Sequence, residues 1–269
     1  MIINNRLYKN LNIRSLKIYP SIFNYLRQLK NGTGDETNGR HILPPLVVKL
    51  CSENKTASIL DVGAGYGKDL LAIKTILSGA SLAAIEGYPP AVAHLQECGV
   101  NVTSINLEHD SLPFADKSFD VVVCNQVIEH VKELFWLVSE LTRVCKFGGY
   151  LVIGVPNLGS LHNRVALLLG KQPPAIHVFG PHVRGFTNDG LRDFLQSGNV
   201  LRVDTVLGGN FYPFAPAFSR VLARWFPGLA VSSFFAIEKI SDSNFLEVLD
   251  SPRGAELVDT PYFRGGQTN

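Results

Sequence analysis

Three glycines follow a short apolar run near residue 60 and form the first segment of the chain suited to binding a ligand. The run is Ile59–Val62, and the glycines are Gly63, Gly65 and Gly67, ahead of a segment rich in Leu and Ile. Glycine tolerates positive φ and has no side chain to block a ligand, while the start of a helix offers unpaired N–H groups and a positive dipole end. We therefore expect a strand, loop and helix at which a nucleotide-like ligand contacts the backbone, Ala64 included.

The spacing of these glycines argues against a dinucleotide. The dinucleotide fingerprint has glycine at its first, third and sixth places, but Lys68 stands at the sixth place and Gly67 comes one residue early. Asp61 lies two residues before the first glycine, where its carboxylate would repel a diphosphate and attract the ammonium group of an amino-acid ligand. An NAD-dependent oxidoreductase is therefore the less favoured interpretation.

Glu86 ends the next apolar run, Leu82–Ile85, about where a doubly wound sheet places the acid that binds ribose hydroxyls. The alternative is a solvated acid at a strand end. Because the glycine loop precedes it, the ribose role is favoured, and we include Gly87 in the same predicted site.

From Ala57 onward, apolar runs of strand length alternate with segments of helical period, which is typical of a mostly parallel sheet covered by helices on both faces. The clearest helix has an apolar stripe from Val131 to Cys145, and Thr187 is a good N-cap for another. The fold class is therefore α/β. The strands are predicted near 57–62, 82–86, 101–106, 120–124, 149–155, 200–207 and 231–238.

The composition narrows the range of partners and of domain arrangements. A chain of 269 residues, 46% of them hydrophobic, can close one large core, and a net charge of +2 provides no basic stripe for nucleic acid. We expect a cap or lid over residues 1–55, a main domain over 56–240 with an insertion at 208–230, and a flexible tail over 241–269.

The four cysteines are far apart and lack the paired spacing of a zinc site. No ligand cluster with a recognisable spacing appears, so we expect no metal. Reduced thiols fit a cytoplasmic protein, and the sequence has no apolar run of the length of a signal peptide or a membrane span.

The stretch from Asn106 to Cys124 resembles the class I S-adenosylmethionine (SAM) dependent methyltransferases, of the type 11 or type 12 kind. It contains the Leu-Pro-Phe segment at 112–114 and a Ser-Phe-Asp-Val-Val run at 118–122, and Glu129-His130-Val131 follows. With the glycine loop and Glu86, these motifs arrive in the family's order over roughly residues 57–205. The resemblance implies a Rossmann-like methyltransferase fold, a doubly wound, mostly parallel sheet of seven strands with the last strand antiparallel, and SAM as cofactor.

The same resemblance assigns residues to parts of the cofactor. Asp61 and the glycine loop would hold the methionine part of SAM, Glu86 the ribose, and residues 106 to 108 the adenine edge. The family usually has Asp where this chain has Asn106, but an amide oxygen can still accept a hydrogen bond from the adenine amino group. The residues predicted from the adenine edge to the sulfonium end are Asn106, Leu107, Glu108, Asn125 and Gln126.

Methyl transfer from a sulfonium is an in-line displacement, which needs a base only where the acceptor must lose a proton. His130, His162 and His182 are the candidate bases. Arg184 shares a face with His182 if the stretch is extended, and could hold an anion beside it. Each of these side chains could instead make ordinary local contacts. The predicted substrate-binding residues are Asn157, Arg164 and Arg184.

Aromatic residues alternate with Arg220 and Arg224 in the insertion at 208–230, a pattern that suits a membrane interface. The alternative is that the insertion packs on the N-terminal cap and shapes an acceptor pocket. We therefore expect a cytoplasmic protein, with peripheral contact at the inner face of the membrane through 208–230 as an open alternative.

The favoured function is a SAM-dependent methyltransferase acting on a small-molecule, glycan or lipid-linked acceptor through oxygen or nitrogen. The polar segment at 160–187 is similar to that of a subgroup found with cell-envelope glycan and lipid-modifying enzymes. Two alternatives stay open: a non-catalytic SAM-binding module and, less favoured, an NAD-dependent oxidoreductase. The oligomeric state does not follow from the sequence.

Overall fold

The computed structural model describes residues 41–251, 254 and 262–265. Most of the predicted cap, residues 1–40, therefore lies outside the described residues. Within the described part of the chain, no helix is both long enough and apolar enough to cross a membrane.

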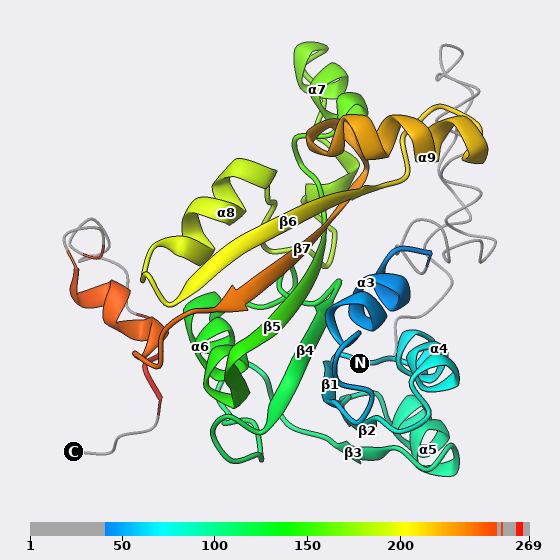
Figure 1. The fold of residues 1–269 in the computed structure, drawn as a ribbon. Coiled ribbons are helices and arrows are strands. Elements are labelled where there is room, and N and C mark those ends of the chain that lie inside the picture. The colour runs from blue at the N-terminus through cyan, green and yellow to red at the C-terminus, as the bar shows by residue number, and fades with distance from the viewer. Residues whose placement is uncertain (1–40, 252–253, 255–261, 266–269) are drawn as a thin grey trace. The chain divides into compact units, whose positions relative to one another are not determined.

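A seven-stranded sheet is the centre of the described fold (Figure 1), with strands in the order β3-β2-β1-β4-β5-β7-β6. Strands β1 to β5 pair in parallel, whereas β7 is antiparallel to both β5 and β6. This confirms the predicted α/β class, the seven strands and the antiparallel last strand. The strands are β1 (Ser58–Val62), β2 (Ser81–Ile85), β3 (Asn101–Thr103), β4 (Phe119–Asn125), β5 (Cys145–Pro156), β6 (Leu201–Gly209) and β7 (Ser232–Lys239).

Helices cover both faces of the sheet because successive strand residues point to opposite sides. Ile59 packs with the face covered by α3, α4 and α5, while Leu60 packs with the face covered by α6 and α8. These helices are α3 (Leu43–Leu50), α4 (Lys68–Ile76), α5 (Pro89–Glu97), α6 (Leu134–Val144) and α8 (Asn188–Gln196). Helix α6 ends one residue earlier than its apolar stripe predicts, since Cys145 already begins β5. Thr187 is the N-cap of α8, as expected, and accepts a hydrogen bond from the Gly190 amide.

Two terminal segments differ from their predicted roles. Helix α3, expected to be part of a lid, buries Leu43 and Val47 completely against the sheet. After residue 240, where a flexible tail was expected, a 3₁₀-helix over Phe245–Asp250 buries Phe245 and Leu246 in the core beside α6. The polar composition of this stretch, and a helical period of three, concealed its apolar side from a search for the 3.6-residue repeat.

The connections after β5 and β6 lie together beyond the carboxyl ends of the parallel strands (Figure 1). Leu161 of the first connection packs with Phe211, Ala223 and Ala230 of the second. The insertion therefore contacts α7, and its predicted contact with the N-terminal cap falls on residues outside the described part. The elements here are α7 (Leu161–Leu168), the 3₁₀-helix Pro174–Ile176, α9 (Pro216–Trp225) and the 3₁₀-helix Pro227–Leu229.

Candidate active site

The loop between β1 and α4 has the backbone shape that its glycines allow. Gly63, Gly65 and Gly67 all have positive φ, between 54° and 76°. The amides of Gly63 and Ala64 donate to the carbonyl of Ile85, which fixes the loop at the carboxyl end of β2. A Cβ on Gly63 would lie 2.3 Å from Val127 Cγ2, whereas one on Gly65 meets no atom within 4 Å. Gly63 therefore serves internal packing, and Gly65 leaves open space that a ligand can fill.

Glu86 is joined to this loop. Its carboxylate accepts hydrogen bonds from the amide of Gly65 at 2.6 Å and from the amide of Tyr88 at 2.7 Å. A carboxylate has about four acceptor positions, so two are still available for ribose hydroxyls. A Cβ on Gly87 would also meet no atom within 4 Å. This arrangement leaves room for the ribose of SAM, and ribose binding by Glu86 and Gly87 stays a prediction.

Asp61 and Asn125 lie at the carboxyl ends of the neighbouring strands β1 and β4. Asp61 is 5% exposed and stands in register with Val123. The Asn125 amide donates to Asp69, in the first turn of α4, at 3.4 Å. The strand ends of a parallel sheet are where ligands bind, and both predicted cofactor residues lie there.

The segment predicted to contact adenine uses its polar side chains to hold its own shape. The Asn106 side chain accepts from the amide of Glu108, and the Glu108 carboxylate accepts from the amides of Lys132 and Glu133 just before α6. Leu107 packs against the core. Adenine contact by these three residues stays a prediction, and their observed role is to tie this loop to the start of α6.

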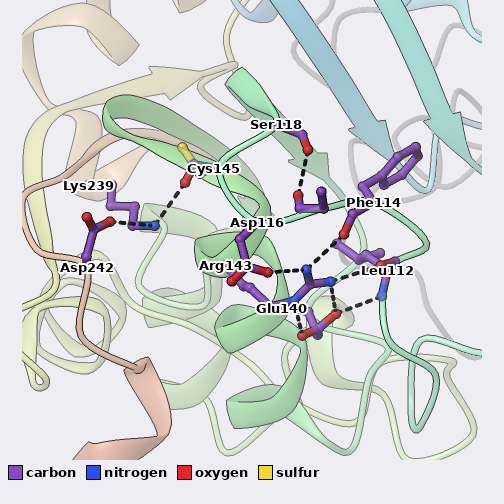
Figure 2. Close-up of polar contacts among 10 residues, drawn as sticks. Leu112, Phe114, Asp116, Ser118, Glu140, Arg143, Cys145, Lys239 and Asp242 are labelled. Carbon is purple, nitrogen blue, oxygen red and sulfur yellow. Dashed lines mark hydrogen bonds and ion pairs between the residues drawn. The ribbon is translucent and has the colours of Figure 1, made fainter.

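Helix α6 fixes the next part of the same loop (Figure 2). The Arg143 guanidinium donates to the carbonyls of Leu112 and Phe114 and pairs with Asp116 and Glu140. Glu140, only 4% exposed, also accepts from the Leu112 amide at 2.7 Å. The Leu-Pro-Phe segment is therefore held by one buried acid and its arginine.

Gln126 follows β4 with φ of 58°, a conformation that side chains other than glycine rarely adopt. Its amide donates to the carbonyl of Gly154, and its buried Nε2 has no acceptor among the described residues. Strained backbone and unsatisfied polar atoms concentrate at functional sites. The turn that begins here leads directly to Glu129.

Two of the three candidate histidines come together at this turn. The ring centroids of His130 and His182 lie 4.7 Å apart. The amide of Val183 donates to the Glu129 carbonyl at 2.8 Å, which docks the segment around His182 onto the turn after β4. Nδ1 of His130 lies 3.2 Å from the carbonyl oxygen of Pro181, and Nδ1 of His182 lies 2.5 Å from that of Ala175.

Glu129 is buried beside this pair. It is 1% exposed, and neither of its carboxylate oxygens has a hydrogen-bond donor among the described residues. Burial raises the pKa of Glu129 to about 7. Burial also lowers the pKa of His130, an effect that the hydrogen bond to Pro181 opposes and the nearby His182 reinforces. In the sequence Glu129 belongs to the Glu-His-Val motif without an assigned role, and its place next to His130 is the one signal that could have marked it.

His162 lies in different surroundings. It contacts Ser160 at 3.2 Å and packs edge-on against Tyr212, and burial lowers its pKa to about 4.

The three predicted substrate-binding residues have three different surroundings. Arg184 donates to the carbonyl of Lys132 near the histidine pair. Arg164 donates to the carbonyl of Gly159 and lines a separate cavity of about 280 Å³. Asn157 is 1% exposed, and its amide donates to the carbonyls of Gly228 and Ala230 and accepts from the amide of Gly159. That saturated side chain joins two connections, so its observed role is structural.

Comparison with known proteins agrees with this geometry. Residues 60–153 match the family model of a methyltransferase domain. A probable SAM-dependent methyltransferase of Mycobacterium tuberculosis is 32% identical over 150 residues, which cover 56% of this chain and 49% of that protein. A ubiquinone biosynthesis O-methyltransferase of Rickettsia conorii is 31% identical over 113 residues, covering 40% of this chain and 38% of that protein. The chain thus spans half or less of the length of these relatives.

A crystal structure of a SAM-dependent methyltransferase from Thermotoga maritima has a TM-score of 0.56 at 19% identity, and the match covers 82% of this chain and all of that one. This likeness shows the fold. With the matched family model and the glycine loop, it shows that the chain carries a class I SAM-dependent methyltransferase domain, whose cofactor is SAM.

Proposed function

We propose that the protein transfers the methyl group of SAM to an oxygen or nitrogen atom of a small-molecule, glycan or lipid-linked acceptor. The observation that carries this proposal is the pairing of His130 and His182 next to the turn that ends β4. Because a carbonyl oxygen only accepts hydrogen bonds, Nδ1 of each ring is the donor. In the neutral rings Nε2 is therefore a free base, able to take a proton from an acceptor.

Other residues of the site would bind SAM and orient it toward the acceptor. Bound SAM supplies an electrophilic methyl group on a sulfonium. Asp61 and Glu86 hold its amino-acid and ribose ends, and the backbone of Gly65 leaves room for it. His182 accepts the proton of the acceptor as the nucleophile attacks in line. The name of the Rickettsia relative, an O-methyltransferase, supports oxygen as the nucleophile.

The test begins with binding. Calorimetric titration with SAM, with its demethylated product and with NAD should show binding of the first two alone. Transfer of radioactive methyl groups from SAM is then measured over a panel of hydroxyl and amine acceptors. Binding of NAD and not SAM would sink the proposal, and tight SAM binding without transfer to any acceptor would favour the non-catalytic module.

We further propose peripheral contact of α9 with an anionic lipid surface. Phe218, Val221 and Trp225 are more than half exposed and lie at three- and four-residue steps, so they form one outward stripe, while Ser219 and Ala223 face inward. In the connection after β5, Leu168 at the end of α7 is 87% exposed and Phe179 is 97% exposed. Apolar side chains flanked by arginines at 220 and 224 are suited to insertion among charged headgroups.

Flotation with vesicles containing phosphatidylserine tests this contact. The wild-type chain should float with the vesicles, and the variant carrying Phe179→Ser and Trp225→Ser should not. Phe147, 63% exposed at the start of β5 and so at the amino-terminal edge of the sheet, provides a matched control in Phe147→Ser. Absence of the wild-type chain from the floating fraction would rule the contact out.

A further inference from the structure

Glu129, His130 and His182 form a cluster that the methyl-transfer chemistry does not fully explain. Each offers one ligand atom, and these three atoms lie within 4.8 Å of one another. Nε2 of His130 is 4.0 Å from Oε1 of Glu129. Two ligands of a tetrahedral ion with bonds of about 2.1 Å stand roughly 3.4 Å apart, so small side-chain rotations bring the three atoms to bonding distance.

The histidines are oriented as metal ligands usually are. In metal sites the ring nitrogen that does not bind the ion commonly donates to a backbone carbonyl or a carboxylate, which fixes the tautomer. Nδ1 of His130 makes this contact with Pro181, and Nδ1 of His182 makes it with Ala175. Both Nε2 atoms are therefore set to receive a cation. A single general base would need only one such ring.

The acid supplies an independent observation. Glu129 is 1% exposed, yet among the described residues no donor reaches either carboxylate oxygen. A buried carboxylate without a hydrogen bond or a counter-charge is costly, and buried acids are normally paired or bind metals. A cation between Glu129 and the two Nε2 atoms would supply the missing partner.

We propose that Glu129, His130 and His182 bind one divalent first-row transition-metal ion, of which Zn²⁺ and Mn²⁺ are the probes. Two imidazoles and one carboxylate are a donor set typical of such ions. Three protein ligands leave coordination positions open, as in catalytic metal sites. The His130 side chain is 39% exposed, which gives the ion a route from solvent. The sequence could not indicate this site, because His182 is distant in the chain from the other two ligands.

The role of the ion in catalysis rests on the proposed function, whereas its binding does not. When the ion is bound, Nε2 of each histidine is a ligand and neither ring is a base, so the ion replaces His182 in activating the acceptor. An acceptor hydroxyl on the ion would have a lowered pKa and would give its proton to water. The oxygen lone pair then forms the bond to the methyl carbon, and the electrons of the broken carbon–sulfur bond stay on sulfur. The acceptor class this favours is a compound with neighbouring hydroxyls, which can occupy two open positions at once.

The test uses the full chain after treatment with a chelator and dialysis. Titration with MnCl₂ and with ZnCl₂ should show one ion per chain, and Co²⁺ should give the visible absorption bands of a site with nitrogen ligands. Glu129→Gln and His182→Gln should each weaken Mn²⁺ binding more than about 100-fold, beyond the 10–100-fold typical of residues that only orient ligands. His177→Gln, an exposed histidine of the same segment, should leave it unchanged.

Titration of each variant with SAM keeps the two proposals separate and verifies folding. A wild-type chain that binds SAM but binds Mn²⁺, Zn²⁺ and Co²⁺ no more tightly than His182→Gln would overturn the metal site alone. One ion per chain without methylation of any acceptor would overturn the proposed function and leave the metal site standing.

Discussion

The predicted cofactor side and the proposed acceptor side of this molecule are built differently. On the cofactor side, Gly63, Gly65 and Glu86 lie in two short segments whose amides and carboxylate bond one another directly. On the acceptor side, His182 reaches His130 from a distant segment, and the buried carboxylate of Glu129 has no donor among the described residues. The first region is held by contacts between two segments that are close in the sequence, whereas the second depends on a distant segment and contains a buried carboxylate that accepts no hydrogen bond from the described residues. This difference suits a domain that keeps one cofactor and adapts its acceptor.

The largest effect is expected from a substitution of His182, which should lower the turnover rate without lowering the affinity for SAM. His182→Ala should lower kcat by about 10²–10⁴-fold, the contribution typical of a positioned base, while the Kd for SAM changes less than about threefold. Steady-state kinetics with a productive acceptor and calorimetry with SAM measure the two quantities. His177→Ala is the control. Unchanged turnover in His182→Ala would remove this residue from the mechanism.

A substitution on the cofactor side should lower the affinity for SAM more than the turnover rate. Glu86→Ala removes the acceptor of the Gly65 and Tyr88 amides together with the predicted ribose contact. Hydrogen bonds to a charged group contribute about 1.5–3 kcal/mol, so SAM affinity should fall about 10–100-fold, with a smaller change in kcat at saturating SAM. Glu97→Ala, an exposed acid on α5, is the matched control. If SAM affinity is equal in the two variants, Glu86 does not bind the ribose.

Helix α6 holds the loop that contains the Leu-Pro-Phe segment. Its buried acid, Glu140, should contribute mainly to the free energy of unfolding. Glu140→Ala leaves the Leu112 amide and part of Arg143 without a partner and should reduce the free energy of unfolding by about 2–3 kcal/mol. Urea denaturation measures this loss. Asp116→Ala removes a 70% exposed partner of the same arginine and should cost less than about 1 kcal/mol. Equal losses would show that burial of Glu140 is not what fixes the loop.

The smallest expected effect lies away from both regions, at Asp120 in β4. Burial raises the pKa of Asp120, but hydrogen bonds from Lys146 and Ser58 outweigh it and hold the pKa below its ordinary value. A carboxyl with a lowered folded-state pKa stabilises the fold above its unfolded pKa of about 3.9, and that stability is lost as the pH falls through the folded value. Because the pair is partly exposed, the contribution is less than about 1 kcal/mol.

Urea unfolding of the wild type and of Asp120→Asn between pH 3 and pH 7 measures this contribution. The stability difference between them should be constant near neutral pH and shrink below about pH 4. SAM binding at neutral pH should be the same in both. A difference that widens as the pH falls would contradict the assignment.

Features with a local cause could be read from the sequence. The alternation of apolar runs predicted all seven strands, with β3 and β5 differing most in their limits. Thr187 was recognised as an N-cap because its bond to the Gly190 amide spans only three residues. The glycine loop was recognisable because glycine is the residue that most readily adopts the positive φ found at Gly63, Gly65 and Gly67.

Features that are formed by segments distant in the chain could not be predicted from the sequence. Phe245 looked like part of a polar tail, and Asn157 looked like a substrate contact, until packing placed both in the interior. The segment around Val183 docks on the turn that contains Glu129, more than fifty residues away in the sequence. Burial depends on which surfaces pack together in the folded chain, and the spacing of residues along the sequence does not predict these contacts.

The sequence by itself determined the sheet, the glycine loop and the acid that follows β2, since each depends on hydrogen bonds and side-chain periods within a few residues. Only the tertiary structure decided that His130 and His182 stand together with Glu129, and that His162 does not join them. Long-range packing decides which histidines meet, because it depends on where distant parts of the chain contact one another. The proposed acceptor side therefore could not be assembled from the sequence.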